Sequence, residues 1–163
     1  MSIIDELIFD RTQADVDRQL YLESRWDPFS KKFSGTLEEA DEWLAGTKGT
    51  YGAADLNRVG EALIYIAERF NAAGYTVEVS PRTDWSSADW VTPSVANQLL
   101  RDLKLLRSQF SQEVSTPSVP DDMEELTYTE ANAIEQILAA VDHLLSNIMA
   151  AWYSSGDLYC GEV

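Results

Sequence analysis

The most constraining feature of this chain is an apolar seam in its last third. Between Thr127 and Tyr153, apolar residues repeat at alternating steps of four and three: Ile134, Leu138, Val141, Leu145, Ile148 and Trp152. This spacing is typical of a long helix that buries one face against other helices. Neighbouring apolar positions make the seam wider than a two-stranded coiled coil requires. We therefore expect packing inside the domain, with assembly between subunits as the alternative.

Earlier segments also carry helix signals. Thr12 and Thr36 are each followed three residues later by an acid, the spacing of a capping box, so a helix is predicted to begin at each. The first is predicted to run toward Arg25, and the second to be short and to end at Gly46. A third helix is predicted through 56–70, where apolar residues repeat by three and four, and Gly74 follows as its left-handed cap.

A fourth helix is predicted after Thr92, because Pro93 suits the first position of a helix. Its apolar residues run to Phe110. The next stretch, 111–122, is rich in Ser, Pro, Thr and Val, and we interpret it as a linker and hinge before the long last helix.

One strand is predicted, at 75–80, because Tyr75, Val77 and Val79 alternate with polar residues before Pro81. A strand needs a partner. The candidates are the segment 4–9 or a strand edge from another subunit. The sequence thus predicts a mainly α fold, a helical bundle with a long C-terminal helix and at most a minor β element, as a single domain over residues 1–163.

The charge of the chain limits its partners. Twelve basic and 28 acidic residues give a net charge of -16, and no Lys or Arg follows Arg107. Such a chain repels phosphate backbones and anionic membranes, so we expect no nucleic acid and no membrane as partner. Cys160 is the single cysteine, and the N-terminus lacks the charge and apolar core of a signal peptide. We expect synthesis in a reducing cytoplasm.

No residue pattern predicts a reaction, a metal or a cofactor. His143 is the only histidine, and a Glu three residues before it, as in di-metal bundles, is missing. The glycine-rich segment 46–52 matches a phosphate loop poorly and is better explained as a turn. Acidic clusters at 38–42 and 121–125 could attract a cation, but solvated acids at helix starts are the simpler interpretation. We expect no enzyme, although a pocket with two carboxyls of raised pKa would argue for one.

A partner interface is the kind of site that the sequence favours. Trp85 and Trp90 lie in a polar loop, where aromatic residues often anchor contacts between proteins, although both rings could instead plug the end of the bundle. The candidate interface comprises this loop, the predicted strand and the helical seam: Trp85, Trp90, Val77, Val79, Ile134, Leu138, Val141, Leu145, Ile148 and Trp152.

Several segments resemble a group of small proteins encoded among the tail and structural genes of tailed phages and prophages of Gram-positive gut bacteria. These segments are Phe9–Val16, Lys48–Gly60, Tyr65–Tyr75, Thr83–Trp85 and Leu126–Glu135. The resemblance implies a structural role in a virion or tail, with other phage structural proteins or a second copy as partner, and a location in the host cytoplasm or the virion. It brings no catalytic signature.

The leading hypothesis is therefore a structural or adaptor protein of a phage tail that acts by protein–protein contact. The alternative is an anionic inhibitor or DNA mimic from the same mobile element, which the net charge favours. Against this alternative, the acids of the last helix are too sparse to imitate the phosphates of a duplex.

Overall fold

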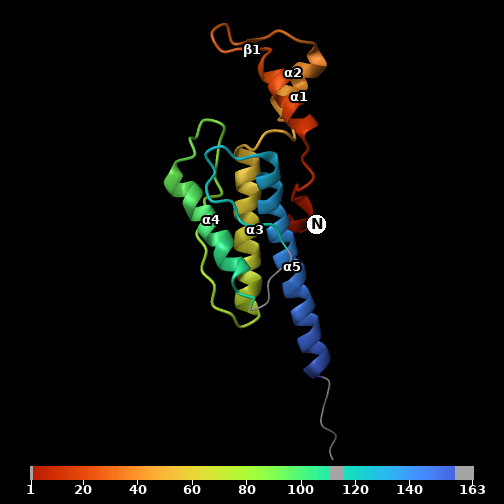
Figure 1. The fold of residues 1–163 in the computed structure, drawn as a ribbon, viewed down its shortest axis with the longest axis vertical. Helices are drawn as coiled ribbons and strands as arrows, with labels where there is room; N and C mark the ends of the chain where they lie inside the picture. The colour runs from red at the N-terminus through yellow and green to blue at the C-terminus, as the bar shows by residue number, and fades with distance from the viewer. Residues whose placement is uncertain (1, 111–115, 157–163) are drawn as a thin grey trace, which may run out of the picture.

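The computed structural model describes residues 2–110 and 116–156, the last four of them by their backbone alone. Two parts can be distinguished, which we call the bundle and the arm (Figure 1). The bundle consists of a short 3-10 helix and three long helices: η1 (Ile3–Glu6), α3 (Ala53–Ala72), α4 (Pro93–Arg107) and α5 (Tyr128–Gly156). The arm, residues 12–46, holds two short helices and a hairpin: α1 (Gln13–Glu23), β1 (Trp26–Asp27), β2 (Lys32–Phe33) and α2 (Leu37–Ala45).

The core of the protein lies where α3 packs against both α4 and α5. Each helix turns one apolar stripe toward the others, as the three-and-four spacing predicts. The residues buried most completely include Leu63, Ile66 and Phe70 on α3, Leu103 and Leu106 on α4, and Ile134, Leu138, Val141 and Leu145 on α5. The prediction of a mainly α bundle with a long C-terminal helix is confirmed.

The helix ends also follow the sequence signals. Thr12 and Thr36 each accept a backbone hydrogen bond from the acid three residues on, and that acid bonds back to the threonine N–H. These are the two predicted capping boxes. At the end of α3, Gly74 has φ 90° and the N–H of Tyr75 donates to the carbonyl of Phe70 over 3.0 Å. The Phe70 and Tyr75 rings then meet edge to face, 5.2 Å apart, so the predicted left-handed cap is confirmed.

The predicted strand at 75–80 is wrong. That segment is neither strand nor helix, and side chains bind the backbone groups of Val77 and Ser80 in place of a neighbouring strand. The Asn71 amide accepts from the N–H of Val77 (2.8 Å) and donates to its carbonyl (2.9 Å). The N–H of Ser80 donates to Asp102 on α4 (3.1 Å). The alternation of apolar and polar residues at 75–80 arises because Val77 points into the core while Thr76 and Glu78 face solvent.

The β structure of the described residues lies elsewhere, in the arm. There β1 and β2 form a two-residue antiparallel ladder that pairs Trp26 with Phe33 and Asp27 with Lys32. Strands this short leave no period in the sequence, which explains why the hairpin was missed. The segment 4–9, considered as a strand partner, contains part of η1 instead.

Figure 1 shows the arm projecting beyond one end of α3 and α5, while α5 extends past the other end of the bundle. Residues 116–122 of the predicted linker have neither helix nor strand. Residues 111–115 and Cys160 lie outside the described residues. Within the described ranges, no helix combines the length and apolar character that a bilayer span requires.

Candidate functional site

The structure separates the predicted interface residues into buried and accessible ones. Four residues of the seam, Ile134, Leu138, Val141 and Leu145, are 0% exposed. They pack within the bundle, so in this fold they have no surface for a partner. This corrects their assignment to an interface and agrees with the expectation of packing inside the domain. The physical reason is that α3 and α4 of the same chain already cover this face of α5.

The other candidates divide in the same way. Val77 and Trp85 are buried, and Val79 is partly buried against the core. Trp152 is half exposed, and its ring stacks on that of Tyr75 within the same chain. Trp90 stands apart from them because it is 89% exposed. Of the two loop tryptophans, Trp90 therefore keeps the accessibility that an interface anchor needs.

Trp85 is fixed by the bundle. The side chain of Asn57, on α3, accepts from its N–H (2.7 Å) and donates to its carbonyl (3.0 Å). The guanidinium of Arg82 lies over its ring, 4.3 Å from the centroid. The same loop approaches Gly60 so closely that a Cβ there would lie 2.8 Å from the carbonyl oxygen of Arg82. Trp85 is thus the plug that the alternative interpretation described.

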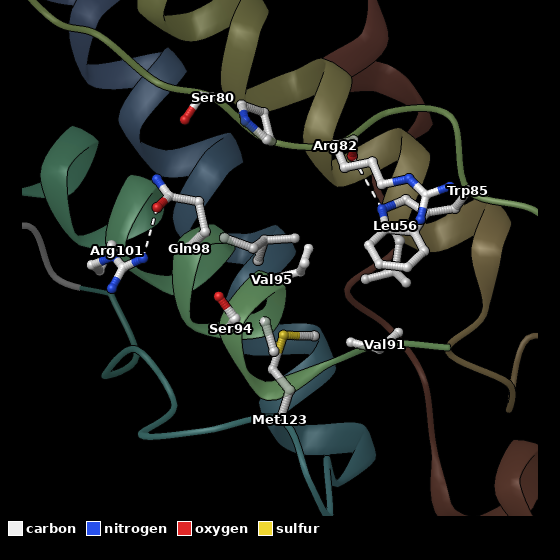
Figure 2. A pocket seen from close by; sticks show the side chains of 13 residues that line it. Leu56, Ser80, Arg82, Trp85, Val91, Ser94, Val95, Gln98, Arg101 and Met123 are labelled. Atoms are coloured by element: carbon white, nitrogen blue, oxygen red, sulfur yellow. Dashed lines mark hydrogen bonds between the residues drawn. The ribbon is translucent and has the colours of Figure 1, made fainter. Parts of the chain in front are cut away.

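A cavity of about 300 Å³ opens between this loop and α4. Figure 2 shows Leu56, Trp85, Val95 and Met123 around it, with Arg82 and Arg101 at its edges. The polar groups at its edges already have partners. Arg82 pairs with Asp84 and Asp89, and Arg101 donates to Gln98.

The described residues that line this cavity include no Asp or Glu, so they offer no carboxyl group for general acid–base catalysis. Asp102 lies next to it and accepts from Ser80 and Gln98. Burial raises the pKa of the Asp102 carboxyl, but the second carboxyl that a general acid and base would require does not line the same cavity.

The most unusual chemistry of the structure is a buried cluster of four charged residues, Arg11, Asp55, Arg58 and Glu135, which we call the charge cluster. Glu135 is 0% exposed and lies on α5 among core residues. Its carboxylate accepts from Arg11 (2.8 Å), from Arg58 (2.8 and 3.0 Å) and from the N–H of Ile8 (2.6 Å). Asp55 accepts from both arginines, at 2.7 and 2.5 Å. Two positive and two negative groups thus neutralise each other, with Arg11 and Glu135 buried and Asp55 and Arg58 in slight contact with solvent.

Burial opposes the charge of Arg58, but the hydrogen bonds and charges of Glu135 and Asp55 outweigh it and hold its pKa above the ordinary value. Tyr51 covers the cluster, with its ring 5.3 Å from the guanidinium of Arg11. Burial raises the pKa of the Tyr51 hydroxyl, and the nearby carboxylates add to this effect. The Arg58 guanidinium therefore stays charged between Asp55 and Glu135, which is typical of a structural role.

The charge cluster ties the start of the arm to the bundle. Arg11 directly precedes the arm, and its backbone exchanges two hydrogen bonds with the amide of Asn132 on α5. Asp55 also accepts from the N–H of Gly52 over 2.9 Å, which closes the capping box at the start of α3. After the arm, Lys48 pairs with Asp10, and a Cβ at Gly49 would collide with the carbonyl oxygen of Asp15. The segment 46–52 is thus a tight turn against α1.

The arm itself is poor in buried apolar groups. Leu22 is its one apolar side chain that is buried among the described residues, whereas six of the twelve exposed large apolar side chains belong to it. These six, which we call the arm surface, are Leu20, Tyr21, Trp26, Phe29, Leu37 and Leu44. Polar contacts hold the two arm helices together, notably the ion pair between Arg18 and Glu42 at 2.6 Å.

Sequence reasoning missed both the charge cluster and the arm surface. A charged residue at position 135, between the buried Ile134 and Ile137, was the available signal for the cluster. The spacing of Asp55 and Arg58, one helical turn apart, was a second signal. For the arm surface there was no such signal, since Leu37 and Leu44 follow one face of α2 as residues of a buried face would.

His143 and the two acidic clusters, considered above as possible metal or catalytic sites, make only local contacts. His143 is exposed on α5, where its ring lies 3.3 Å from the amide of Asn147. Glu39, in the first acidic cluster, caps α2. In the second cluster, Asp122 accepts from the N–H of Glu124. Among the described residues, no group of three or more potential metal ligands comes together.

No protein-family model matches the chain, and no curated protein or solved structure shows significant similarity to it.

Proposed function

We propose that this protein is a structural or adaptor protein of a phage tail, which acts by protein–protein contact through its arm. The observation that carries this proposal is the combination of a rigidly anchored base and an apolar, exposed surface. Phe29 is 97%, Leu37 is 86% and Leu44 is 80% exposed. A soluble domain normally scatters such residues singly, whereas here they gather on one projecting part.

The arm surface offers a sizeable apolar contribution to binding. Complete burial of one large apolar side chain contributes about 1.5–3 kcal/mol. Burial of Leu20, Phe29, Leu37 and Leu44 would therefore contribute roughly 6–12 kcal/mol, before the cost of association is subtracted. The charge cluster supports such a use because Arg11 holds the start of the arm against α3 and α5, and a fixed surface loses less entropy on binding.

The assignment to a phage tail rests on the resemblance of the chain segments described above. The alternative, an anionic inhibitor or DNA mimic, has less support. Two of the acids on α5 are neutralised within the chain, Glu135 by the charge cluster and Asp142 by Arg69. Neither is free to imitate a phosphate.

Affinity capture from cells that are producing phage particles tests this proposal. The bait is the wild-type chain or the arm variant Phe29→Ser/Leu44→Ser, and captured proteins are identified by mass spectrometry. We expect the wild type to retain an identified phage structural protein and the arm variant to lose it. Because both side chains are almost fully exposed, the variant should fold normally, which circular dichroism verifies.

The matched control is Leu105→Ser, which changes an exposed leucine on α4, outside the arm. This control should capture the same phage protein as the wild type. The proposal is refuted if the wild type captures no phage structural protein, or if the arm variant captures it equally well. Capture of a nucleic-acid enzyme that DNA displaces would favour the inhibitor instead.

A further inference from the structure

The tip of the arm hairpin combines an apolar and a basic group in a chain that is otherwise strongly acidic. Phe29 is 97% exposed, and Lys31 and Lys32 follow it with exposed side chains. Neither lysine forms an ion pair within the described residues. The tip is also preshaped, because Asp27 accepts from the N–H of Phe29 (2.9 Å) and from the hydroxyl of Ser30 (2.6 Å). Such a tip would bind a hollow with apolar walls and negative charge.

The same chain contains a hollow of that kind. A groove of about 600 Å³ lies between the start of α4 and the segment before α5. Trp90, Val91 and Met123 supply apolar walls, and Asp122 and Glu124 supply negative charge. No basic residue is among the described residues that line it. We call it the acidic groove.

The tip cannot fill the acidic groove of its own chain. In Figure 1 the hairpin stands well clear of the start of α4, and the contacts of Arg11 with Asp55 and Glu135 hold the start of the arm at the bundle. Occupation therefore requires another molecule. Charge is what favours a second copy of this chain, since Lys31 and Lys32 match Asp122 and Glu124 in number and are opposite in sign.

We infer that the hairpin tip of one copy docks into the acidic groove of a second copy, with Phe29 against Trp90 and the two lysines facing Asp122 and Glu124. The two surfaces differ, so one contact leaves a free tip and a free groove. Repetition of the contact closes a dimer or a ring, or continues as a chain. This inference rests on the proposed function, contact through the arm, and it names a second copy of the chain as the partner of the hairpin tip.

Charge reversal provides a specific test, because two variants that cannot associate alone should associate together. In Lys31→Glu/Lys32→Glu, a negative tip meets the negative groove. In Asp122→Lys/Glu124→Lys, the positive tip meets a positive groove. Each variant should sediment as a monomer of 18.3 kDa at about 0.15 M salt, which screens the long-range repulsion between acidic copies more than the close charge pairs, and where the wild type forms a larger species. In an equimolar mixture, each tip meets a groove of opposite charge, and association should return.

Matched controls place the same change of charge elsewhere. Arg101→Glu/Lys104→Glu on α4 and Glu61→Lys/Glu68→Lys on α3 change exposed residues outside both surfaces. Both controls should associate like the wild type. Phe29→Ser should weaken association at least tenfold without altering the circular dichroism spectrum, because its ring is almost fully exposed.

A wild type that remains monomeric at every concentration overturns the inference. So does association of either reversed variant alone, or failure of their mixture to associate. These results are distinct from failure of the proposed function. A monomeric wild type that captures a phage structural protein through the arm would reject the second copy as partner and leave the function standing.

Discussion

Replacement of Glu135 by glutamine should destabilise the protein strongly. The carboxylate receives four hydrogen bonds, from Ile8, Arg11 and twice from Arg58. Glutamine keeps one oxygen, and its amide N–H groups would face the N–H groups of the guanidinium ions. Asp55 would then be left as the sole carboxylate of the cluster for the buried Arg11 and the partly buried Arg58. Removal of one partner from a buried ion pair costs about 3–5 kcal/mol.

This loss would be a large fraction of the free energy of unfolding, which is about 5–15 kcal/mol for a typical domain. Urea denaturation, followed by circular dichroism, measures it for the wild type and the variant. The matched control is Glu61→Gln, the same substitution at an exposed position of α3, which should change the free energy of unfolding by less than about 0.5 kcal/mol. Hydrogen exchange should also become faster in residues 12–46, because Glu135 holds the backbone of Ile8 at the base of the arm.

A cost below about 1 kcal/mol for Glu135→Gln would refute this reasoning, since it would mean that the side chain is not buried in an ion-pair network. A large loss of free energy of unfolding with unchanged hydrogen exchange in residues 12–46 would refute the proposed anchoring of the arm. The cluster would then stabilise the bundle without anchoring the arm.

Three further predictions concern local contacts. Asn71→Ala should cost about 1–3 kcal/mol in urea denaturation, because the N–H and carbonyl of Val77 lose both of their partners, and a cost near zero would contradict it. Gly49→Ala should cost about 1–3 kcal/mol, because its new Cβ collides with the backbone of Asp15, whereas unchanged stability would mean that this turn yields easily. Acid titration should show stability falling as the pH drops below about 5. Hydrogen bonds to the capping threonines lower the pKa values of Asp15, Glu39 and Glu130 below the ordinary values of 3.8 for Asp and 4.5 for Glu. The contribution of these acids to the free energy of unfolding is therefore present above the ordinary values and is lost as the pH falls through the lower values of the folded state. Stability that stays constant down to pH 3 would contradict this prediction.

Periodicity and capping in the sequence determined the helices of the bundle. The spacing from Ile134 to Leu145 is repeated at every turn, so it predicts both a long helix and the face that it buries. Caps act within four residues, and the boxes at Thr12 and Thr36 and the cap at Gly74 therefore appear in the structure where the sequence places them. Net charge is likewise a property of the sequence alone.

Tertiary structure decided which residues are accessible and which polar groups meet. Period-two alternation at 75–80 could not reveal that Asn71 would bind Val77 in place of a neighbouring strand. Nor could local pattern join Arg11, Asp55 and Glu135, which lie 44 and 124 positions apart from the arginine along the chain. For the same reason, the sequence could not show that the seam is buried, or that the exposed apolar residues lie on the arm, where we propose the interface. Burial depends on what the rest of the chain covers, and no short segment carries that information.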